Sequence, residues 1–486
     1  MSRVLSNLEP KELWAIFEDI CQIPHPSKKE EKIIEFAKNF GESLGLQTIV
    51  DHVGNVIIRK PATPGMENRT GIILQGHLDM VPQKNNDTVH DFKTDPITPI
   101  IDGEWVRANG TTLGADNGIG AAAALAVLQD KTLKHGPLEV LLTIDEETGM
   151  TGAFELKPGL LNGKILINLD SEDEGELYIG CAGGVDTLAT FSYREQKVPS
   201  GHVAYKLEVK GLKGGHSGLD INLGRGNANK ILNRILWDAA RNLGLELSLI
   251  DGGSLRNAIP RESSAVFAIP ESNSGDLEKL VASYQAIISK ELGEADPGLK
   301  VILSKTDIPD YIIEREISKK LFDTLYACPN GAMRMISDMP EVVETSTNLA
   351  IVKSGNGKIE VACLSRSSVD SAKDDLANML RAVFELAGAK VETSGSYPGW
   401  KPNLNSPILK TTSQVYLDKY GKVPEQKVIH AGLECGILAG AYPGLDMVSF
   451  GPTIRNPHSP DEKVNIKTVK LFWDYLVATL ENAPVE

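Results

Sequence analysis

The segment GIILQGHLDM at residues 71–80 is the most informative part of the sequence, because an apolar run of strand length is followed directly by a histidine and, two residues later, an aspartate. Three similar runs follow along the chain, PLEVLLTI at 137–144, KILINL at 164–169 and DMVSFG at 446–451. Short, mainly apolar runs are typical of strands that are buried on both faces of a parallel sheet. Helical segments such as IGAAAALAVLQD at 119–130 separate them. The sequence therefore predicts an α/β fold with a mostly parallel central sheet.

The middle of the chain has a different pattern. After Gly184, half-buried strand patterns such as YKLEVKGL at 205–212 mix with amphipathic helices, which indicates an α+β arrangement. Turn-forming residues then cluster in SGSYPGWKPNLNSP at 394–407, and the α/β pattern resumes. We expect one α/β domain in two parts and an inserted α+β domain, with the boundaries 1–184, 185–397 and 398–486.

Composition excludes several classes of protein. The 486 residues allow two or three domains, and 41% hydrophobic with 24% charged residues is typical of an ordered protein in water. The net charge of -15 opposes binding to nucleic-acid phosphates. We find neither a secretory signal nor an apolar run of membrane-spanning length, and the five scattered cysteines form no disulfide pattern. We expect a cytoplasmic protein with neither nucleic acid nor membrane as a partner.

Polar side chains able to bind metal ions stand just beyond three of the apolar runs. They are His77 and Asp79 after the first run, Asp145, Glu146 and Glu147 after the second, and Asp170 and Glu172 after the third. In an open α/β sheet, the carboxyl ends of the strands meet at one edge, so these side chains are expected to converge. Taken singly, each motif has an ordinary alternative, a polar pair for H-x-D or a solvated acidic turn for the two glutamates.

Two more candidates come from other segments. Asp116 lies in TTLGADNGIG at the start of an Ala-rich helix, where an aspartate is also a common helix cap. His458 lies in the proline-rich loop GPTIRNPHSPDEKV. The combined set has two imidazoles and three carboxylates, which suits zinc, cobalt or manganese, and one bridging carboxylate could hold two ions. This set is His77, Asp116, Glu147, Asp170 and His458.

Eight segments closely resemble the bacterial Xaa-His dipeptidases, also called peptidase D or aminoacyl-histidine dipeptidases. These are carnosinase-type members of the two-zinc aminoacylase/dipeptidase family of metallopeptidases. The segments occur in family order across nearly the whole chain and are HLDMVP, GTTLGADNGIG, DEETGM, NLDSEDEGELYIGCAGG, GLKGGHSG, SLRNAIPRE, HAGLECG and GPTIRNPHSPDE.

The resemblance implies a catalytic α/β domain with two divalent metal ions per chain, zinc or else cobalt or manganese. One ion would be bound by Asp116, Glu147 and His458, and the other by Asp116, His77 and Asp170. Asp79 would orient His77, and Glu146 would be the general base. Family members often carry a cis peptide bond after the bridging aspartate, so we expect one between Asp116 and Asn117.

The inserted domain resembles the lid of the family, which closes over the substrate. His216, in GGHSG, would reach the developing oxyanion, and Asn257 with Arg366 would hold the terminal carboxylate of the substrate. Without the resemblance, a turn histidine, a loop asparagine and a surface arginine would be the ordinary interpretations of these residues.

The expected function is metal-dependent hydrolysis of dipeptides with a free amino terminus, including Xaa-His substrates such as β-alanyl-histidine. One alternative is an aminoacylase acting on N-acyl amino acids. Another is a catalytically silent metal-binding protein. Glu146 argues against this alternative, because a pure binding site has no use for a carboxylate base. A homodimer is possible, and the role of Glu434 is open. Cys435 fits a buried apolar position better than a nucleophile.

Overall fold

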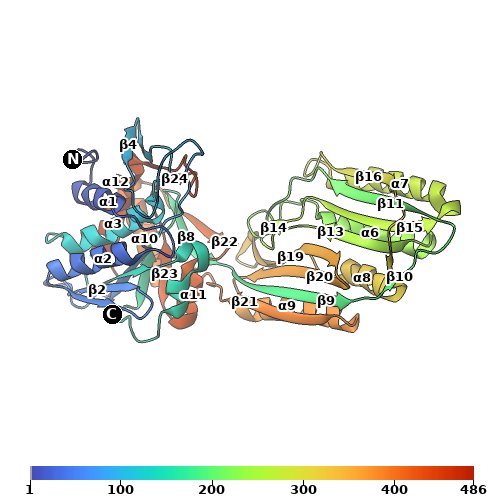
Figure 1. Ribbon diagram of the computed structural model, residues 1–486. Coiled ribbons are helices and arrows are strands. Elements are labelled where there is room, and N and C mark those ends of the chain that lie inside the picture. The colour runs from blue at the N-terminus through green and yellow to red at the C-terminus, as the bar shows by residue number, and fades with distance from the viewer. Residues whose placement is uncertain (1–2, 486) are drawn as a thin grey trace. The chain divides into compact units, whose positions relative to one another are not determined.

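The computed structural model describes residues 3–485 and divides the chain into two compact units (Figure 1). The first unit comprises Met1–Gly180, Trp400–Val428 and Leu433–Glu486, and the second comprises Cys181–Gly399 and Ile429–Gly432. The divisions after Gly180 and before Trp400 lie within a few residues of the expected boundaries. The sequence did not indicate that the short segment Ile429–Gly432 returns to the second unit.

The first unit contains an eight-stranded sheet. Its strand order is β1 (Gln47–Val50), β2 (Val56–Lys60), β6 (Leu138–Thr143), β3 (Ile72–His77), β7 (Ile165–Asn168), β23 (Asp446–Ser449), β8 (Glu176–Cys181) and β22 (Glu425–Ile429). The four apolar runs singled out in the sequence are the four neighbouring strands β6, β3, β7 and β23, and they pair in parallel. The flanking pairs β1·β2, β2·β6 and β23·β8 are antiparallel. The prediction of a mixed α/β fold with a parallel centre is confirmed.

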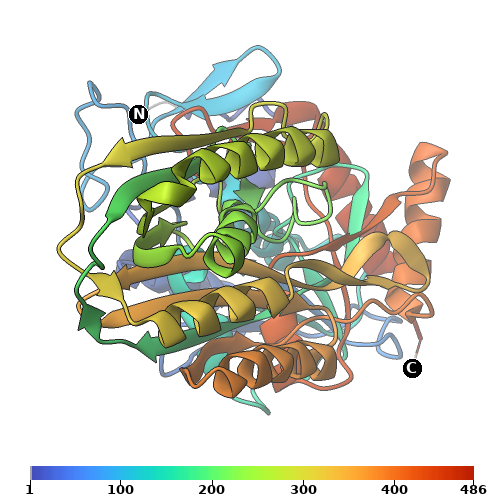
Figure 2. The same ribbon diagram turned by 90° about the vertical axis from the view of Figure 1, so that its right-hand side faces the viewer.

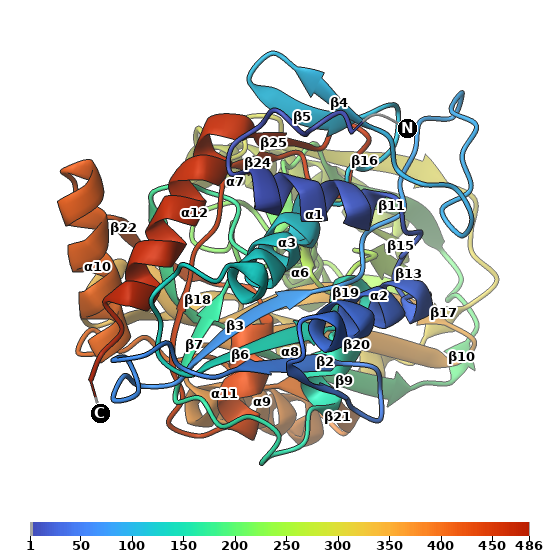
Figure 3. The same cartoon turned by 90° about the vertical axis from the view of Figure 1, so that its left-hand side faces the viewer.

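Helices cover this sheet, and its central strands β3, β6 and β7 are therefore buried along their whole length. Figure 3 shows α2 and α3 in front of the central strands, with α1 packed beside α3. The alanines of α3 are buried, which lets the helix approach the sheet closely. The helices of this unit are α1 (Lys11–Cys21), α2 (Glu31–Ser43), α3 (Ala115–Gln129), α4 (Glu146–Gly149), α5 (Thr151–Glu155), α10 (Pro407–Tyr420), α11 (Glu434–Ala441) and α12 (Ile466–Glu481).

A small antiparallel sheet completes the first unit. Its strands, in order, are β24 (Ile454–Arg455), β25 (Lys463–Asn465), β5 (Trp105–Ala108) and β4 (Pro99–Asp102). The loop between β24 and β25 carries His458. Across residues 3–485, no helix combines the length and apolar character that crossing a lipid bilayer requires.

The second unit has a nine-stranded sheet whose described pairs are all antiparallel. The path is β16 (Lys300–Thr306), β11 (His202–Lys210), β15 (Ser263–Pro270), β13 (Glu246–Gly252), β19 (Met339–Gly355), β20 (Lys358–Ser367), β9 (Gly183–Ser192) and β21 (Lys390–Tyr397), and β18 (Gly331–Ile336) pairs with β19. Two short pairs are β10 (Glu195–Gln196) with β17 (Ile312–Ile313) and β12 (Gly215–His216) with β14 (Ala258–Ile259).

The helices of the second unit lie over one face of this sheet in Figure 2. They are α6 (Ala228–Asn242), α7 (Ser274–Leu292), α8 (Arg315–Ala327) and α9 (Asp370–Leu386), and a single 3₁₀ turn, η1 (Glu271–Asn273), precedes α7. Apolar side chains of the helices and the sheet form one core, with Phe267, Phe322 and Phe384 among its fully buried members. The expected α+β arrangement matches this unit.

Candidate active site

Asp116 lies where the chain enters α3, but it is not a helix cap. Gly114 occupies the N-cap position with a positive φ of 72°, and Asp116 and Asn117 have non-helical backbone angles inside the first turn. The peptide bond between Asp116 and Asn117 is cis, as predicted. The Asn117 side chain donates to the Leu169 carbonyl oxygen at 2.8 Å, and the Asp116 carboxylate faces two histidines.

An imidazole lies against each oxygen of this carboxylate. His77 Nε2 is 3.2 Å from Asp116 Oδ1, and His458 Nε2 is 3.1 Å from Asp116 Oδ2. Each imidazole also meets a second carboxylate, Asp170 at 3.4 Å from His77 and Glu147 at 3.0 Å from His458. The five residues thus form two groups that share Asp116, and within each group the potential ligand atoms lie within 4.8 Å of one another.

The acidic turn after β6 is shaped by Asp145. Asp145 adopts a left-handed conformation with φ 54°, and its carboxylate accepts hydrogen bonds from the hydroxyls of Thr148 and Thr151. The chain therefore turns sharply at the end of the strand, and the adjacent residues Glu146 and Glu147 open α4.

Asp79 connects His77 to the same turn. Its carboxylate lies 3.3 Å from His77 Nδ1 and accepts hydrogen bonds from the backbone N–H of Glu146 at 2.9 Å and of Glu147 at 3.3 Å. The Ser27 hydroxyl donates to it at 2.8 Å. His77 Nδ1 has the backbone carbonyl oxygen of Asp79 as its hydrogen-bond partner at 3.0 Å, with the Asp79 carboxylate beside it, and His77 presents Nε2 to Asp116. Such partners on the second nitrogen orient metal-binding histidines.

The electrostatics of the cluster are those of crowded acids. Burial, with a contribution from Asp116 and Glu147, raises the pKa of Asp170 to about 7. Burial also raises the pKa of Glu146 well above its usual range. The carboxylates of Asp116 and Glu147 raise the pKa of His458 to about 11, which favours the positively charged form of its imidazole. A cluster in which several carboxylates lie this close together is suited to cations.

Two oxygen atoms in the cluster support the same interpretation. Glu147 Oε1 and Asp170 Oδ1 are buried, and neither accepts a well-aligned hydrogen bond from any residue in the described range 3–485, although Asp170 Oδ1 has His77 Nε2 at 3.4 Å. Buried carboxylate oxygens normally have a partner, because desolvation without one is unfavourable. With two imidazoles and three carboxylates converging, the residues fit divalent ions that accept nitrogen and oxygen ligands.

Two buried glutamates beside the cluster were not assigned a role from the sequence. Glu434 accepts hydrogen bonds from Gln75 at 2.6 Å and Thr143 at 2.8 Å, and burial raises its pKa to about 8. Glu462 accepts hydrogen bonds from the backbone that leads to Asp116, and burial with Asp116 raises its pKa to about 7. The sequence places Glu462 four residues after His458, but its partners follow only from the fold.

The remaining three predicted residues belong to the second unit, where Ser217 connects them. Ser217 donates its backbone N–H to the Asn257 carbonyl oxygen at 2.8 Å, and its hydroxyl lies 3.4 Å from Arg366 Nε. Arg366 is buried and also donates to Tyr397 at 3.0 Å, so it is not a surface arginine. His216 is the neighbour of Ser217 in the chain.

Comparison with known proteins assigns the family. Residues 73–482 match the pattern of peptidase family M20/M25/M40. The chain belongs to this family. It is 50% identical over 482 residues, 99% of both chains, to the cytosol non-specific dipeptidase of Escherichia coli strain K12. The expected family and the assignment as a hydrolase are therefore confirmed.

Solved structures agree with the family assignment. The crystal structure of the aminoacylhistidine dipeptidase from Vibrio alginolyticus is 52% identical, with a TM-score of 0.96 over 99% of this chain and 98% of that one. Aminopeptidase PepT from Bacillus cereus is 16% identical with a TM-score of 0.57, covers 98% of this chain and 99% of its own, and shows the shared fold alone.

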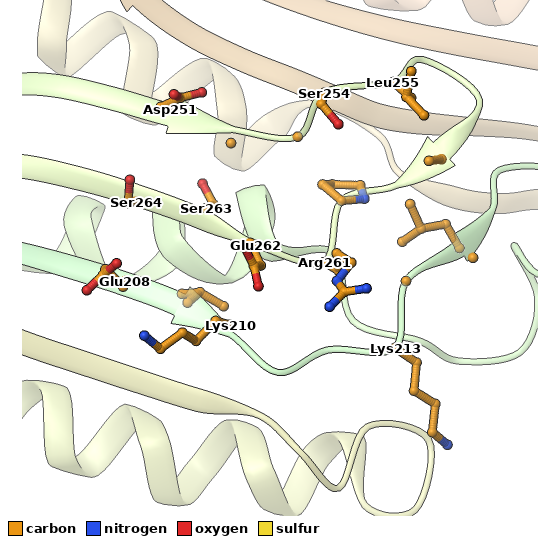
Figure 4. A pocket seen from close by; sticks show the side chains of 18 residues that line it. Glu208, Lys210, Lys213, Asp251, Ser254, Leu255, Arg261, Glu262, Ser263 and Ser264 are labelled. Carbon is orange, nitrogen blue, oxygen red and sulfur yellow. The ribbon is translucent and has the colours of Figure 1, made fainter. Parts of the chain in front are cut away.

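The second unit of this M20 peptidase also holds a cavity of about 720 Å³ (Figure 4). None of the predicted site residues lines it. Its charged lining has both signs, from Glu208, Asp251 and Glu262 and from Lys210, Lys213 and Arg261. Because the charges do not select a cation or an anion, we assign no ligand to this cavity.

Proposed function

We propose that the chain hydrolyses dipeptides with a free amino terminus, Xaa-His dipeptides such as β-alanyl-histidine among them, at a centre of two divalent metal ions. The observation that carries the proposal is the Asp116 carboxylate held between two imidazoles, each of which has a further carboxylate beside it. Glu146, next to this cluster in the acidic turn, supplies the group that a mere binding site does not need.

The ligands follow from the two groups that share Asp116. One ion would be bound by Asp116, Glu147 and His458, the other by Asp116, His77 and Asp170, and the chemistry suits zinc, cobalt or manganese. Such ions supply Lewis-acid activation of water and of the scissile carbonyl group. Glu146 takes a proton from the attacking water and delivers it to the leaving amine. Asp79 keeps His77 in the orientation that presents Nε2.

In the second unit, His216 has the form that an oxyanion donor needs. Its Nδ1 accepts hydrogen bonds from the backbone N–H of Gly218 at 3.1 Å and Leu219 at 3.0 Å, so the proton of the neutral ring resides on Nε2. Burial and the nearby Arg366 lower the pKa of His216, which favours this neutral ring. We assign Nε2 to the developing oxyanion, and Arg366 with Asn257 to the terminal carboxylate of the substrate.

The names of two relatives support the substrate class. One relative, at 50% identity, is named a cytosol non-specific dipeptidase, and another, at 52%, is named an aminoacylhistidine dipeptidase. Both names describe cleavage of dipeptides, and they differ in the breadth of substrates. The cytoplasmic location expected from the sequence agrees with the first name.

A dipeptide panel tests the proposal. The protein is stripped of metal with a chelator, divided into portions that receive zinc, cobalt or manganese, and assayed on free and N-acetylated dipeptides. We expect no hydrolysis without metal, and recovered hydrolysis of the free dipeptides only. Preferential cleavage of the acetylated substrates would instead indicate an aminoacylase, and no turnover with two bound ions would indicate a silent binding protein.

Replacing the general base separates binding from chemistry. We expect Glu146→Ala to keep its bound metal and to lose a factor of about 10²–10⁴ in kcat, the usual contribution of a positioned proton carrier. Metal content is measured by elemental analysis and kcat with a free dipeptide. Glu155→Ala, which removes an exposed acid nearby in the chain, is the control and keeps the wild-type kcat. A normal kcat in Glu146→Ala would exclude this mechanism.

A further inference from the structure

The Glu462 side chain is buried against the loop that leads to Asp116. Its Oε2 accepts hydrogen bonds from the backbone N–H of Leu113 at 2.7 Å and Gly114 at 3.0 Å. Its Oε1 accepts them from Ala115 at 2.7 Å and from Asp116 itself at 3.2 Å. One carboxylate therefore binds four consecutive N–H groups.

This arrangement depends on the local backbone. Gly114 has a positive φ of 72°, and a left-handed residue in such a run can turn successive N–H groups toward one side, which creates a concave site for an anion. The N–H groups of Leu113 and Gly114 precede α3 and those of Ala115 and Asp116 lie in its first turn, so none of the four has a partner within the helix. Because Glu462 is 2% exposed, no solvent replaces its bonds if the side chain is changed.

Glu462 also connects two ligand-bearing loops. It lies four residues after His458, in the loop between β24 and β25, and its partners run up to Asp116. The same two loops also contact each other through the Asp116 carboxylate, which lies 3.1 Å from His458 Nε2. Since each oxygen of Glu462 already accepts two N–H groups, Glu462 has the contacts of a support and not those of a metal ligand.

We propose that Glu462 is the positioning residue of the metal centre: it holds the Asp116 backbone and the His458 loop in fixed positions, so that the Asp116 carboxylate would be in place for both ions before they bind. The inference rests on the proposed function, because it takes Asp116 as the shared ligand. It predicts that a substitution of Glu462 lowers the affinity for both ions together, although Glu462 is not a ligand of either ion. Outer partners of metal ligands commonly contribute factors of 10 to 100 in affinity.

The test measures metal affinity directly. Glu462→Gln keeps the size of the side chain, but one of its two terminal atoms becomes an N–H₂ donor that faces two backbone donors. Glu462→Asp keeps the charge and is one methylene too short to reach all four N–H groups. The matched control is Asp461→Asn, which removes one negative charge from the same loop at an exposed position. Zinc dissociation constants of both sites are measured by chelator competition at a pH above 7.

We expect both dissociation constants to rise by about 10- to 100-fold in Glu462→Gln and by less in Glu462→Asp, with Asp461→Asn within about twofold of wild type. Urea unfolding of the metal-free proteins is the second measurement, because a merely structural role would lower the unfolding midpoint and leave the dissociation constants unchanged. If Glu462→Gln does not fold, Glu462→Asp carries the same comparison.

Two outcomes are decisive. Wild-type affinity for both ions in the folded Glu462 variants, or weakening of one ion alone, would overturn the positioning role while the two-ion centre stands. A wild-type protein that binds fewer than two ions would instead refute the proposed function itself. The two failures are therefore distinguishable in one set of titrations.

Discussion

Asp116 and the imidazoles on its two sides differ greatly in exposure. His77 is 1% exposed, at the end of a buried strand, whereas the His458 side chain is 51% exposed in its loop. Each nevertheless approaches a different oxygen of Asp116 at nearly the same distance, 3.2 Å and 3.1 Å. The carboxylate therefore has a buried histidine on one side and a half-exposed histidine on the other. Both contacts require the backbone of Asp116 to stay in a fixed position.

At the residue scale, Asp79 is a sensitive position because its carboxylate serves His77 and the acidic turn together. We expect Asp79→Asn to reduce kcat/KM and zinc affinity by about 10- to 100-fold, since a neutral amide supports the imidazole less and cannot accept from all of its donors. Kinetics with a free dipeptide and chelator competition measure the two effects. Ser27→Ala, which removes the 2.8 Å bond to Asp79 and a 3.4 Å bond to the Met80 carbonyl oxygen, is the control and should change both by a few-fold at most.

We expect His430 to make the stability of the protein depend on pH. Burial, with Arg366 and His216 nearby, lowers its pKa from 6.5 to about 3 in the folded state. Below pH 6.5 the unfolded chain binds a proton that the folded chain does not, so stability is present above this pH and is lost as the pH falls. The loss from this residue approaches about 1.4 kcal/mol per pH unit.

Urea unfolding between pH 6.5 and about pH 5 tests this dependence. His430→Gln keeps a polar partner for Ser346, which lies 2.7 Å from His430 Nε2, and it should show a shallower decline than wild type. His202→Gln, at the start of β11 in the same unit, should retain the wild-type slope. Equal slopes in all three proteins would show that His430 does not carry the effect.

At the element scale, the close contact of α3 with the sheet positions the site. Asn117, at the start of α3, bonds to the Leu169 carbonyl oxygen just after β7, so the helix and the strand that bear Asp116 and Asp170 are tied together. Gly120 makes this contact possible, because a Cβ there would lie 2.5 Å from the same oxygen and 2.6 Å from Asn117 Oδ1.

Gly120→Ala should therefore destabilise the protein despite the better helix propensity of alanine. We expect a loss of about 1–3 kcal/mol in the free energy of unfolding, the usual effect of overpacking, together with weaker zinc binding. Gly275→Ala in α7, where an added Cβ meets no atom within 4 Å, is the matched control. Alanine there should be neutral or stabilising by up to about 1 kcal/mol. Urea denaturation measures the free energy of unfolding of both variants. Equal changes in the two variants would contradict the packing argument.

At the scale of the whole molecule, each unit buries its own apolar core. All five cysteines lie in these interiors as buried thiols, at 0% to 2% exposure. Burial raises the pKa of Cys21 far above its usual range, which keeps that thiol protonated and unreactive. The expectation that the scattered cysteines form no disulfide framework agrees with this arrangement.

Thiol titration reports on the integrity of both cores. We expect an aromatic disulfide reagent to label none of the five cysteines in the folded protein and all five in denaturant, because reaction requires access and a thiolate. Absorbance of the released thiol gives the count. Rapid labelling of one or more cysteines in the folded protein would mean that a core opens readily under native conditions.

The four central strands, the change of pattern in the middle of the chain and the types of residue in the site could be predicted from the sequence. These follow from local properties, namely apolar runs of strand length and polar residues directly after them, and the resemblance supplied the pairing of Asp116 with His458. Which atoms contact one another follows from the folded chain alone. Asp116 and His458 are 342 positions apart in the chain and lie within hydrogen-bonding distance of each other. Glu462 accepts a hydrogen bond from the backbone N–H of Asp116, 346 positions away. No local pattern encodes such contacts, because they arise from the packing of separate elements against one another.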